Sequence, residues 1–362
     1  MNMNAKNIIK AVLLTLALGI GIYITMSLTY GSSALLPDCF GYITGGYGKT
    51  MFLEIQKIGP YLDDISINAQ AFLSGYVRSS TGVTVPVEII ATDANYTDFH
   101  SINMTKGAFF SDSQGESGVV ISETLANALF KSIDIVGARF YLFDTEVAVA
   151  GVYKPDRSFL TQISSDGKDY MIIPCNLGAT QNTDVDYLYI GGKADETTLN
   201  RLLGGKLGNY TKVNLSENKK VIMQFNDILV FLLGTMIFVV LFGRLCKLIS
   251  AMIRMIGEKN NRNMGFYIKM GITVTILVAT AYVASFDLYI PAGFFPADRN
   301  ILNIPHYIGL FIDFVQAHNT DDYYFYSSLY FWSVLLIVPT IFINLLLSSK
   351  VISKILTIVR HR

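Results

Sequence analysis

Long apolar segments alternate with polar stretches along this chain of 362 residues. The first apolar segment, Ala11–Pro37, contains no charged residue and has an apolar core of about 20 residues, which is enough to cross a bilayer. A cleaved signal peptide has a shorter apolar core, so this length favours a membrane helix that is retained. Three further apolar segments follow, at Ile228–Gly243, Met270–Phe286 and Tyr323–Ser349. The pattern predicts an α-helical bundle of four transmembrane helices.

The long stretch between the first two apolar segments is polar, rich in glycine and interrupted by turn signals. It contains short runs typical of β-strands, at Val83–Ala91, Gly118–Ile121, Ala138–Phe143, Glu146–Val152 and Tyr170–Ile173. One amphipathic helix is predicted at Glu123–Phe130, with Ser122 as its N-cap, and another at Asp195–Leu203. The stretch therefore reads as one mixed α/β domain inserted between helices 1 and 2.

The distribution of basic residues predicts the orientation of the helices. The connection Arg244–Lys269 holds six basic residues and the single acid Glu258, and the tail after Ser349 is also basic. Cytoplasmic loops are enriched in Lys and Arg, so both segments are expected in the cytoplasm. The connection Asp287–Asp322 has five aspartates against the single basic residue Arg299 and is expected outside. Both termini are therefore predicted to be cytoplasmic.

One apolar part of the outer connection, Ile301–Ala317, contains Pro305 and Asp313, which are unfavourable inside lipid. An interfacial or re-entrant helix is favoured here over a fifth span. The predicted organisation is a cytoplasmic N-terminus at 1–10, transmembrane helix 1 at 11–30, an extracytoplasmic α/β domain at 31–226, transmembrane helix 2 at 227–249, a cytoplasmic coupling segment at 250–265, transmembrane helix 3 at 266–286, an extracytoplasmic loop at 287–322, transmembrane helix 4 at 323–349 and a cytoplasmic tail at 350–362.

The composition agrees with this membrane arrangement. Hydrophobic residues make up 51% of the chain, charged residues only 15%, and the mean hydropathy is +0.41, which is more apolar than an ordinary soluble protein. The formal net charge is +0, so no overall attraction to nucleic acid is expected. Cys39 and Cys175 both lie in the polar domain. We expect two separately buried thiols there, and a disulfide between them is the alternative.

The sequence contains no recognisable pattern of catalytic, cofactor-binding or metal-binding residues. Gly45–Thr50 ends in Gly-Lys-Thr, but Ile43 stands where a P-loop requires its first glycine. The four histidines are far apart and lack the paired spacing of metal ligands. The chain is therefore predicted not to be an enzyme and to need no cofactor.

The cytoplasmic connection contains a segment suited to a protein partner. Ser250–Gly265 is too long for the connection of a minimal helical hairpin and begins with an apolar stripe at Met252, Met255 and Ile256. A short amphipathic helix across the membrane face would present these residues to a partner. The alternative is that they form the cytoplasmic end of the second membrane helix.

Two segments resemble the MacB/FtsX-like ABC transporter permeases. Around Ala91–Tyr153, the stretches ATDANYTDFHSINMTKGAFF, VVISETLANALF and IVGARFYLFDTEVAVAGVYK are similar, in the same order, to motifs of the periplasmic core domain of that family. The segment Ile253–Met270 (IRMIGEKNNRNMGFYIKM) is similar to the family's connection between the second and third membrane helices, which includes the helix that docks on the ATPase. The chain departs from the family in its long connection Asp287–Asp322 and in lacking an acidic residue after Lys269.

This resemblance implies a permease subunit that pairs with a second permease copy or paralogue and with a cytoplasmic ABC-type ATPase subunit. Members of the family couple ATP hydrolysis to movement of the outer domain, which is called mechanotransmission, in export or envelope remodelling. The expected location is a bacterial plasma or inner membrane, with membrane lipid around the helices. The ATPase-coupling residues that the resemblance implies are Ile253, Arg254, Met255, Ile256, Gly257 and Arg262.

Two other functions are compatible with the same topology. A mixed α/β domain between two membrane helices also occurs in extracellular sensors, although the tail after Ser349 is too short for a signalling module. The outer domain could instead activate a cell-wall hydrolase, as in the division-linked members of the family. The sequence leaves open the substrate or client and whether the permease pair is homomeric or heteromeric.

Overall fold

The computed structural model describes residues 3–44, 51–58, 65–79, 82–111, 118–164, 169–177, 180, 183–192, 196–205, 210–257, 270–278, 304–318 and 325–360. The chain divides into two compact units. We call the first the helical unit; it comprises Met1–Ser33, Lys220–Leu310 and Ser333–Arg362. We call the second the domain unit; it comprises Ala34–Lys219 and Phe311–Trp332.

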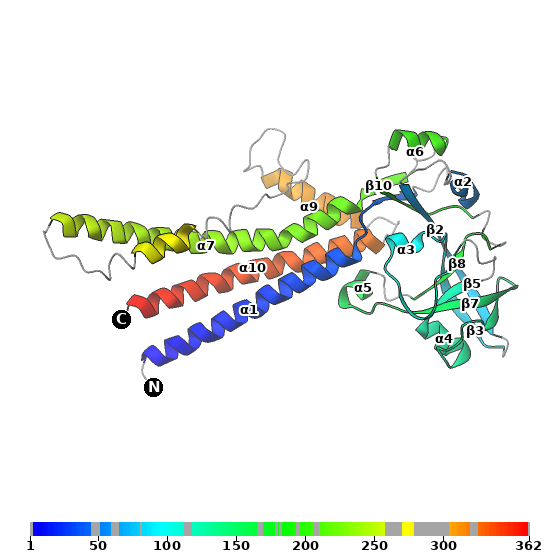
Figure 1. Cartoon of the computed structure of the whole chain (residues 1–362), viewed down its shortest axis with the longest axis horizontal. Helices are drawn as coiled ribbons and strands as arrows, with labels where there is room; N and C mark the ends of the chain where they lie inside the picture. The colour runs from blue at the N-terminus through cyan, green and yellow to red at the C-terminus, as the bar shows by residue number, and fades with distance from the viewer. Residues whose placement is uncertain are drawn as a thin grey trace. The chain divides into compact units, whose positions relative to one another are not determined.

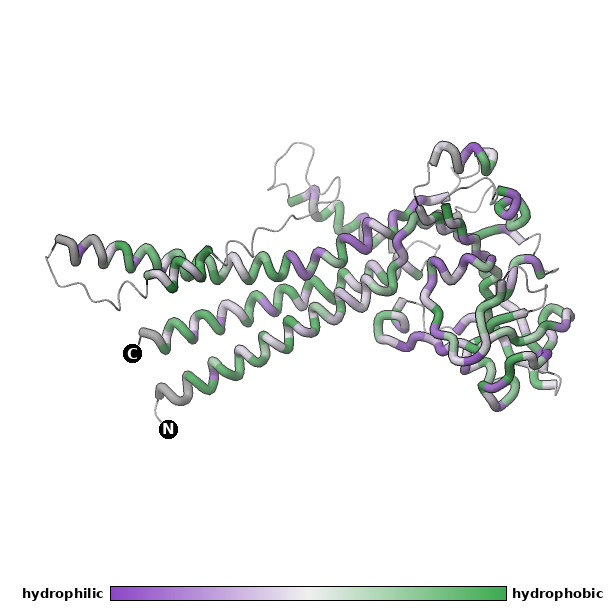
Figure 2. The backbone as a smooth tube through the Cα atoms, viewed as in Figure 1, coloured by the Kyte–Doolittle hydropathy of each residue, from purple (hydrophilic) through white to green (hydrophobic). Residues whose placement is uncertain are grey.

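Three long helices supply most of the helical unit. They are α1 (Met3–Leu35), α7 (Leu215–Gly257) and α10 (Phe325–Arg360) (Figure 1). Among the described residues, three stretches are long and apolar enough to cross a membrane, at Ile8–Leu35, Leu215–Ala251 and Phe325–Ile358. Figure 2 shows the apolar residues that follow one another along each of these helices. Three of the predicted apolar helices are therefore confirmed, at the start, in the middle and at the end of the chain.

The fourth predicted span, Met270–Phe286, is described only in part. Residues 270–278 are helical, and the remainder of this segment lies outside the described residues. The number of spans therefore stays a prediction. The predicted interfacial segment, Ile301–Ala317, largely coincides with α9 (Ile304–His318), a helix of 15 residues with Ile308 and Phe311 exposed. At about 22 Å this helix is shorter than the hydrocarbon core of a bilayer.

The helices α7 and α10 are longer than the apolar segments from which they were predicted. α7 begins at Leu215, within the stretch predicted as domain, and ends at Gly257, within the predicted coupling segment. α10 continues through Pro339 and on to Arg360, past the predicted end of the span. Hydropathy marks the part of a helix that suits lipid, whereas caps and helix-breaking residues decide where the helix ends.

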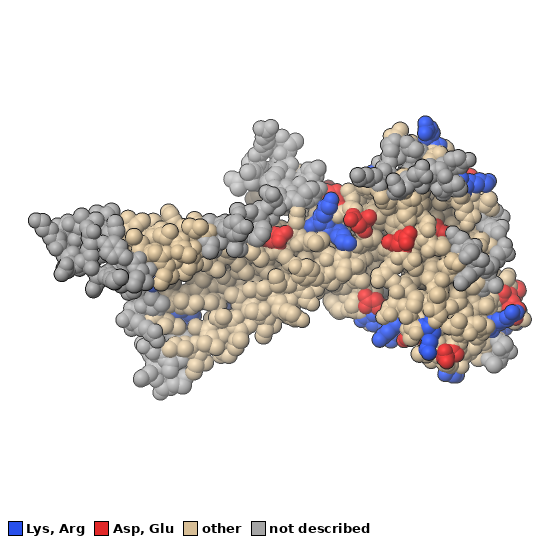
Figure 3. Space-filling view, in the orientation of Figure 1, with Lys and Arg blue, Asp and Glu red and all other residues tan. Residues whose placement is uncertain are grey.

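Charged side chains are distributed unevenly over the surface. On the face seen in Figure 3, many Lys, Arg, Asp and Glu side chains lie on the surface of the domain unit. Long parts of α1 and α10 show only uncharged side chains on that face, as expected for helices that contact lipid.

A ten-stranded mixed sheet forms the centre of the domain unit. Its strands are β1 (Phe40–Thr44), β2 (Ile65–Ser79), β3 (Thr84–Thr92), β4 (Asn103–Gly107), β5 (Gly118–Ser122), β6 (Arg139–Leu142), β7 (Thr145–Lys154), β8 (Tyr170–Pro174), β9 (Tyr187–Gly192) and β10 (Tyr210–Asn214). Their order is β10-β1-β9-β2-β3-β8-β5-β7-β4, and β6 pairs with β2 and β7. The pairs β3–β8 and β5–β7 are parallel, and the other pairs are antiparallel.

Both faces of the central strands are buried. In β5, Val119 and Ile121 belong to the larger hydrophobic core, while Val120 points to the smaller core on the other face. β8 repeats this alternation with Met171 and Ile172. Strands buried on both faces have nearly continuous apolar sequences, which explains why these two were visible in the sequence.

The five predicted strand runs correspond to β3, β5, β6, β7 and β8. The predicted helices correspond to α4 (Glu123–Phe130) and α6 (Glu196–Leu202), and Ser122 caps α4 by accepting a hydrogen bond from the Leu125 N–H at 3.1 Å. β2 was not predicted, although Ile65–Ala71 alternates between apolar and polar residues as a strand does; its polar positions Asn68 and Gln70 are buried rather than exposed. The described residues of the unit also include three short helices: α2 (Phe52–Gln56), α3 (Tyr96–Phe99) and α5 (Phe159–Ser164).

The cysteines of the domain unit do not form a disulfide. Cys39 and Cys175 are both free and buried, which confirms the prediction of two separate thiols. Gln56 Nε2 donates to Cys175 Sγ at 3.3 Å. Both thiols therefore act as packing groups of the core.

Candidate functional site

The domain unit contains one end of each long helix. It includes Ala34 and Leu35 at the end of α1, the first turn of α7 up to Lys219, and the start of α10 up to Trp332. We call these three segments the helix roots. Mechanical coupling between distant parts of a protein travels through packed side chains, hydrogen bonds and rigid elements. The contacts of the helix roots with the sheet are therefore the candidate functional site.

The root of α7 is hydrogen-bonded to the chain that leaves α1. The N–H groups of Leu215 and Ser216 donate to the carbonyl oxygen of Cys39, at 3.1 and 3.2 Å. Ser216 Oγ also donates to the carboxylate of Asp38. A helix leaves its first N–H groups without partners inside the helix, and here the segment between α1 and β1 supplies an acceptor for two of them.

A side-chain cap fixes the first residue of α7. The N–H of Glu217 donates to Asn214 Oδ1 at 3.0 Å, and Asn214 Nδ2 donates to Glu217 Oε2 at 3.2 Å. This reciprocal pair resembles a capping box. Asn214 ends β10, which pairs with β1, the strand that follows α1. The roots of α1 and α7 therefore lead into two neighbouring strands.

The thiol of Cys39 lies beside this junction. Burial, together with the nearby Asp38 carboxylate, raises the pKa of Cys39 to about 12. A thiol with such a pKa stays protonated at neutral pH and is a poor nucleophile. Cys39 therefore has a structural role here.

The root of α10 is held among aromatic rings. Tyr326, which is 3% exposed, stacks on the ring of His100 at a centroid distance of 5.5 Å and an interplanar angle of 14°. Tyr189 of β9 meets both rings edge-on, at 4.7 Å from His100 and 5.9 Å from Tyr326. Tyr96 of α3 also stacks on the ring of His100, at a centroid distance of 4.2 Å. Such ring pairs contribute beyond their buried area because their geometry is specific.

Hydrogen bonds continue from this aromatic group into the sheet. His100 Nδ1 lies 2.5 Å from the hydroxyl of Tyr326, and His100 Nε2 contacts Gln70 Nε2. Gln70 Nε2 donates to Asn68 Oδ1 at 2.7 Å, and Asn68 Nδ2 donates to Asp93 Oδ1 at 2.7 Å. We call Tyr326, His100, Gln70, Asn68 and Asp93 the polar chain. It runs from the root of α10 to the end of β3.

The donors of the polar chain determine the tautomer of His100. An amide nitrogen can only donate, so His100 Nε2 must accept from Gln70. The ring proton is then on Nδ1, which donates to the Tyr326 oxygen. Burial lowers the pKa of His100 to about 3. The imidazole is therefore neutral at physiological pH, and each bond of the polar chain has one donor and one acceptor.

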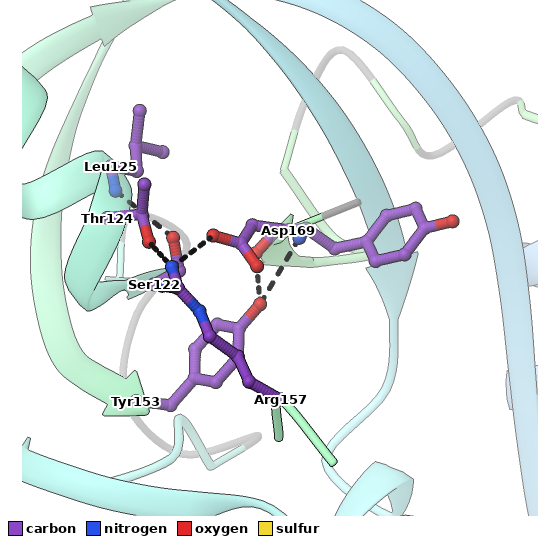
Figure 4. A network of polar contacts seen from close by, with 7 residues as sticks. Ser122, Thr124, Leu125, Tyr153, Arg157 and Asp169 are labelled. Carbon is purple, nitrogen blue, oxygen red and sulfur yellow. Dashed lines mark hydrogen bonds and ion pairs between the residues drawn. The ribbon is translucent and has the colours of Figure 1, made fainter. Parts of the chain in front are cut away.

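A second polar network joins β7 to its neighbours (Figure 4). Arg157 Nη2 donates to Thr124 Oγ1 at 2.8 Å and lies 3.9 Å from the Asp169 carboxylate. The Tyr153 hydroxyl donates to the carbonyl oxygen of Tyr170 at 2.7 Å, and burial raises the pKa of Tyr153. The Arg157 side chain is largely exposed, so its ion pair is weak. This network fastens the end of β7 to α4 and β8 and shows no catalytic arrangement of groups.

The helical unit has a polar contact of its own, between α1 and α10. Asn344 Nδ2 donates to Thr25 Oγ1 at 2.9 Å, and Thr25 Oγ1 lies 2.9 Å from Thr340 Oγ1. Gly21 lies against the Asn344 side chain, where a Cβ atom on residue 21 would overlap Asn344 Oδ1. Small residues allow membrane helices to approach closely, and polar side chains then bond across them. We call this set the α1–α10 contact.

The predicted ATPase-coupling residues lie at the far end of α7. Ile253, Arg254, Met255, Ile256 and Gly257 form its last residues, and the Arg254 side chain is exposed. They continue α7 rather than starting a separate helix within the described part of the segment.

Arg262 lies outside the described residues. Within the described parts of the chain, no group of three or more His, Cys, Asp or Glu residues could hold a metal ion.

The residues of the polar chain were not predicted from the sequence. His100 and Tyr326 are 226 positions apart, and although His100 lies in a stretch that resembles the family, nothing in the sequence links it to Tyr326. Asn68 and Gln70 occupy the polar positions of an alternating run, which the sequence alone assigns to solvent, and only the structure shows that they are buried and paired.

The fold and the helix roots together define a class of protein. It is a membrane protein in which a mixed α/β domain, inserted between the first and second long apolar helices, holds the ends of all three. Residues 9–202, more than half of the chain, match the model of the MacB-like periplasmic core domain. The chain therefore belongs to the MacB/FtsX-like ABC transporter permease family.

Solved structures of the same kind of domain are similar to part of the chain. The extracellular domain of the noncanonic ABC-type transporter YknZ from Gram-positive bacteria is 18% identical, with a TM-score of 0.37, over 49% of this chain and 98% of that domain. The periplasmic region of MacB from Actinobacillus actinomycetemcomitans is 15% identical, with a TM-score of 0.39, over 51% of this chain and 92% of that region. Among curated protein sequences, none matches this chain significantly.

Proposed function

We propose that this chain is the permease subunit of an ABC transporter-type complex whose output is movement of the domain unit. A separate cytoplasmic ATPase hydrolyses the ATP, and a second permease copy or paralogue completes the membrane part. The domain unit lies outside the membrane, and both termini lie in the cytoplasm. Family membership supports the ABC-type assembly, and the Lys/Arg bias of the loops supports the orientation.

The continuity of α7 is the observation that carries this proposal. The helix has 43 residues, which corresponds to a length of about 64 Å. Its first turn is capped within the domain unit by Asn214, and its last turn contains Ile253–Gly257. A continuous helix transmits a displacement from one end to the other because its hydrogen-bonded backbone resists bending. This suits mechanotransmission, in which a movement at the ATPase changes the outer domain.

The exposed side chains of α7 support its place in a membrane assembly. Ile237, Val239 and Phe242 are all more than 40% exposed. Side chains of this kind are stable against lipid or against a second membrane subunit. Lipid and a second permease copy are therefore the expected neighbours of this part of α7.

Co-purification tests the partner. Tagged chain, extracted from its native membrane in mild detergent, should recover an ATPase with a P-loop in near-stoichiometric amount, together with ATPase activity. Arg254→Ala should lower both, whereas Lys247→Ala, which removes an exposed cation from the same helix, should leave them unchanged. A chain that purifies alone, or with a kinase, would contradict the proposal and favour an extracellular sensor. Recovery of a cell-wall hydrolase together with the ATPase would identify envelope remodelling as the output.

The natural cysteines provide a test of orientation without any substitution. Cys246 is exposed near the cytoplasmic end proposed for α7, whereas Cys39 and Cys175 are buried. A membrane-impermeant maleimide should therefore leave intact cells unlabelled and should label Cys246 once the membrane is permeabilised. Labelling of Cys246 in intact cells would place this end of α7 outside and overturn the orientation.

A further inference from the structure

The three helix roots contact the sheet at different places. The roots of α1 and α7 lead into β1 and β10, which stand at one end of the strand order. The root of α10 instead reaches β2 through the polar chain and β9 through Tyr189. β2 is the longest strand and pairs with β3, β6 and β9. If the α10 root moves while the roots of α1 and α7 stay in place, the force therefore acts on β2 and β9, whereas β1 and β10 at the end of the strand order keep their position.

We propose that His100 is the positioning residue through which a movement of the α10 root reaches β2. This inference rests on the proposed function, because it specifies how one membrane helix acts on the outer domain. His100 is the link, since one ring nitrogen bonds Tyr326 of α10 and the other bonds Gln70 of β2. Its ring also stacks on the rings of both Tyr96 and Tyr326, so a shift of the Tyr326 ring displaces it.

The polar chain transmits movement because none of its members can rotate without losing a bond. Gln70 Nε2 serves both His100 and Asn68, so a rotated amide would place its oxygen against a group that offers no proton. Asn68 and Gln70 are 0% and 2% exposed, so water cannot replace a lost partner. A buried donor or acceptor without a partner is costly. The low-energy response to a displaced Tyr326 is therefore a shift of the whole chain, including β2.

Thr92 anchors the far end of the polar chain on the backbone. Asn68 Nδ2 donates to Thr92 Oγ1 at 2.8 Å, and the Thr92 hydroxyl donates to the carbonyl oxygen of Ala69 at 2.9 Å. The N–H of Ala69 donates to Asp93 Oδ2 at 2.9 Å. The chain therefore ends on the paired backbones of β2 and β3, and its movement is a movement of the strands.

Hydrogen–deuterium exchange of the full chain in lipid nanodiscs tests this coupling without any ATPase. Tyr326→Phe removes one oxygen from the α10 root, and we expect amide exchange in peptides covering Ile65–Phe72 of β2 to rise about two- to tenfold. Tyr76→Phe removes the same atom from an exposed tyrosine of β2 and should leave that exchange at the wild-type rate. Unchanged exchange of Ile65–Phe72 in Tyr326→Phe would overturn the proposal.

A double-mutant cycle separates transmission through His100 from a general loss of packing. His100→Phe keeps an aromatic ring but removes both bonds, so adding Tyr326→Phe should change the exchange of β2 little further. Additive effects of the two substitutions would show two independent contacts and would contradict the inference.

Coupling between two sites is reciprocal, so a change in β2 must also be felt at the α10 root. Trp332, the single tryptophan of the chain, belongs to that root and reports on it. Gln70→Leu should shift the Trp332 fluorescence maximum, and an unshifted maximum would count against the inference. These measurements need no ATPase, so they test the coupling through His100 alone. The proposed permease function fails on a different result, the absence of an ATPase in the co-purification.

Discussion

Two asparagines show how differently the two units use a buried polar side chain. Asn68 in the domain unit and Asn344 in the helical unit are both 0% exposed. Asn68 donates to Thr92 and Asp93 and accepts from Gln70, so all its polar atoms have partners. Asn344 donates to Thr25, but its Oδ1 accepts no hydrogen bond from the described residues.

The difference follows from how each unit brings its elements together. Paired strands fix the distances between side chains on neighbouring strands, so a set of complementary donors and acceptors can be completed there. The contact between α1 and α10 depends on close approach at Gly21, and a single side-chain bond is added to it. The stability of the domain unit is therefore expected to depend strongly on its buried polar residues. The stability of the helical unit is expected to depend more on how closely its helices pack.

The largest expected effect is at Asn68. Asn68→Ala should lower the free energy of unfolding by about 3 kcal/mol, because the buried Thr92 and Gln70 and the half-buried Asp93 each lose a hydrogen bond. Thermal unfolding of the full chain, followed by Trp332 fluorescence, measures this change. Asn95→Ala is the matched control, because Asn95 is exposed and donates once, to the carbonyl of Ile67. Equal decreases in the free energy of unfolding of the two variants would show that the buried polar chain stabilises the domain no more than an exposed hydrogen bond does.

The next effect tests the fit of the helices. Gly21→Leu should destabilise the α1–α10 contact by about 2 kcal/mol, because the new side chain overlaps Asn344. Gly19→Leu, two residues earlier on the same helix, has open space around its Cβ position and should be nearly neutral. Unfolding of both variants in nanodiscs gives the comparison. A Gly21 variant as stable as the Gly19 variant would remove close approach as the basis of this contact.

A smaller effect is expected from pH. The pKa of His100 is about 3 in the folded chain and 6.5 as its ordinary value. Below pH 6.5 the unfolded chain therefore binds a proton that the folded chain does not, and stability falls as the pH drops toward 3. Near pH 5.5 the loss should be about 1 kcal/mol. Unfolding measured from pH 7 to pH 5 should show this slope in the wild type and a weaker slope in His100→Phe; equal slopes would contradict a neutral His100.

The smallest effect is expected at Asn344. Asn344→Ala should cost about 0.6 kcal/mol, which is typical of a hydrogen bond between membrane helices, because only one of its bonds is lost. The same unfolding assay applies. A loss as large as that of Asn68→Ala would mean that the α1–α10 contact depends on its polar residues as much as the sheet does, and the comparison would fail.

Much of the fold could be predicted from local patterns. The apolar segments predicted three long helices that the structure contains, and five apolar runs predicted β3, β5, β6, β7 and β8. Ser122 predicted the start of α4 because an N-cap acts on its own helix. β1, β4, β9 and β10 were not predicted, because each has only five or six residues and contains glycine or polar residues that interrupt an apolar run. β2 was not predicted either, although its first residues alternate between apolar and polar.

The sequence by itself determined the membrane class, the inserted α/β domain and the family, because hydropathy, strand runs and ordered motifs are all carried by residues close together in the chain. Only the tertiary structure decided which side chains of the helix roots act together. The partners Tyr326, His100 and Gln70 come from α10, the end of α3 and β2, and they meet because strand pairing and helix packing bring these elements together. Their bonds depend on distances below about 3.2 Å, which no local pattern encodes.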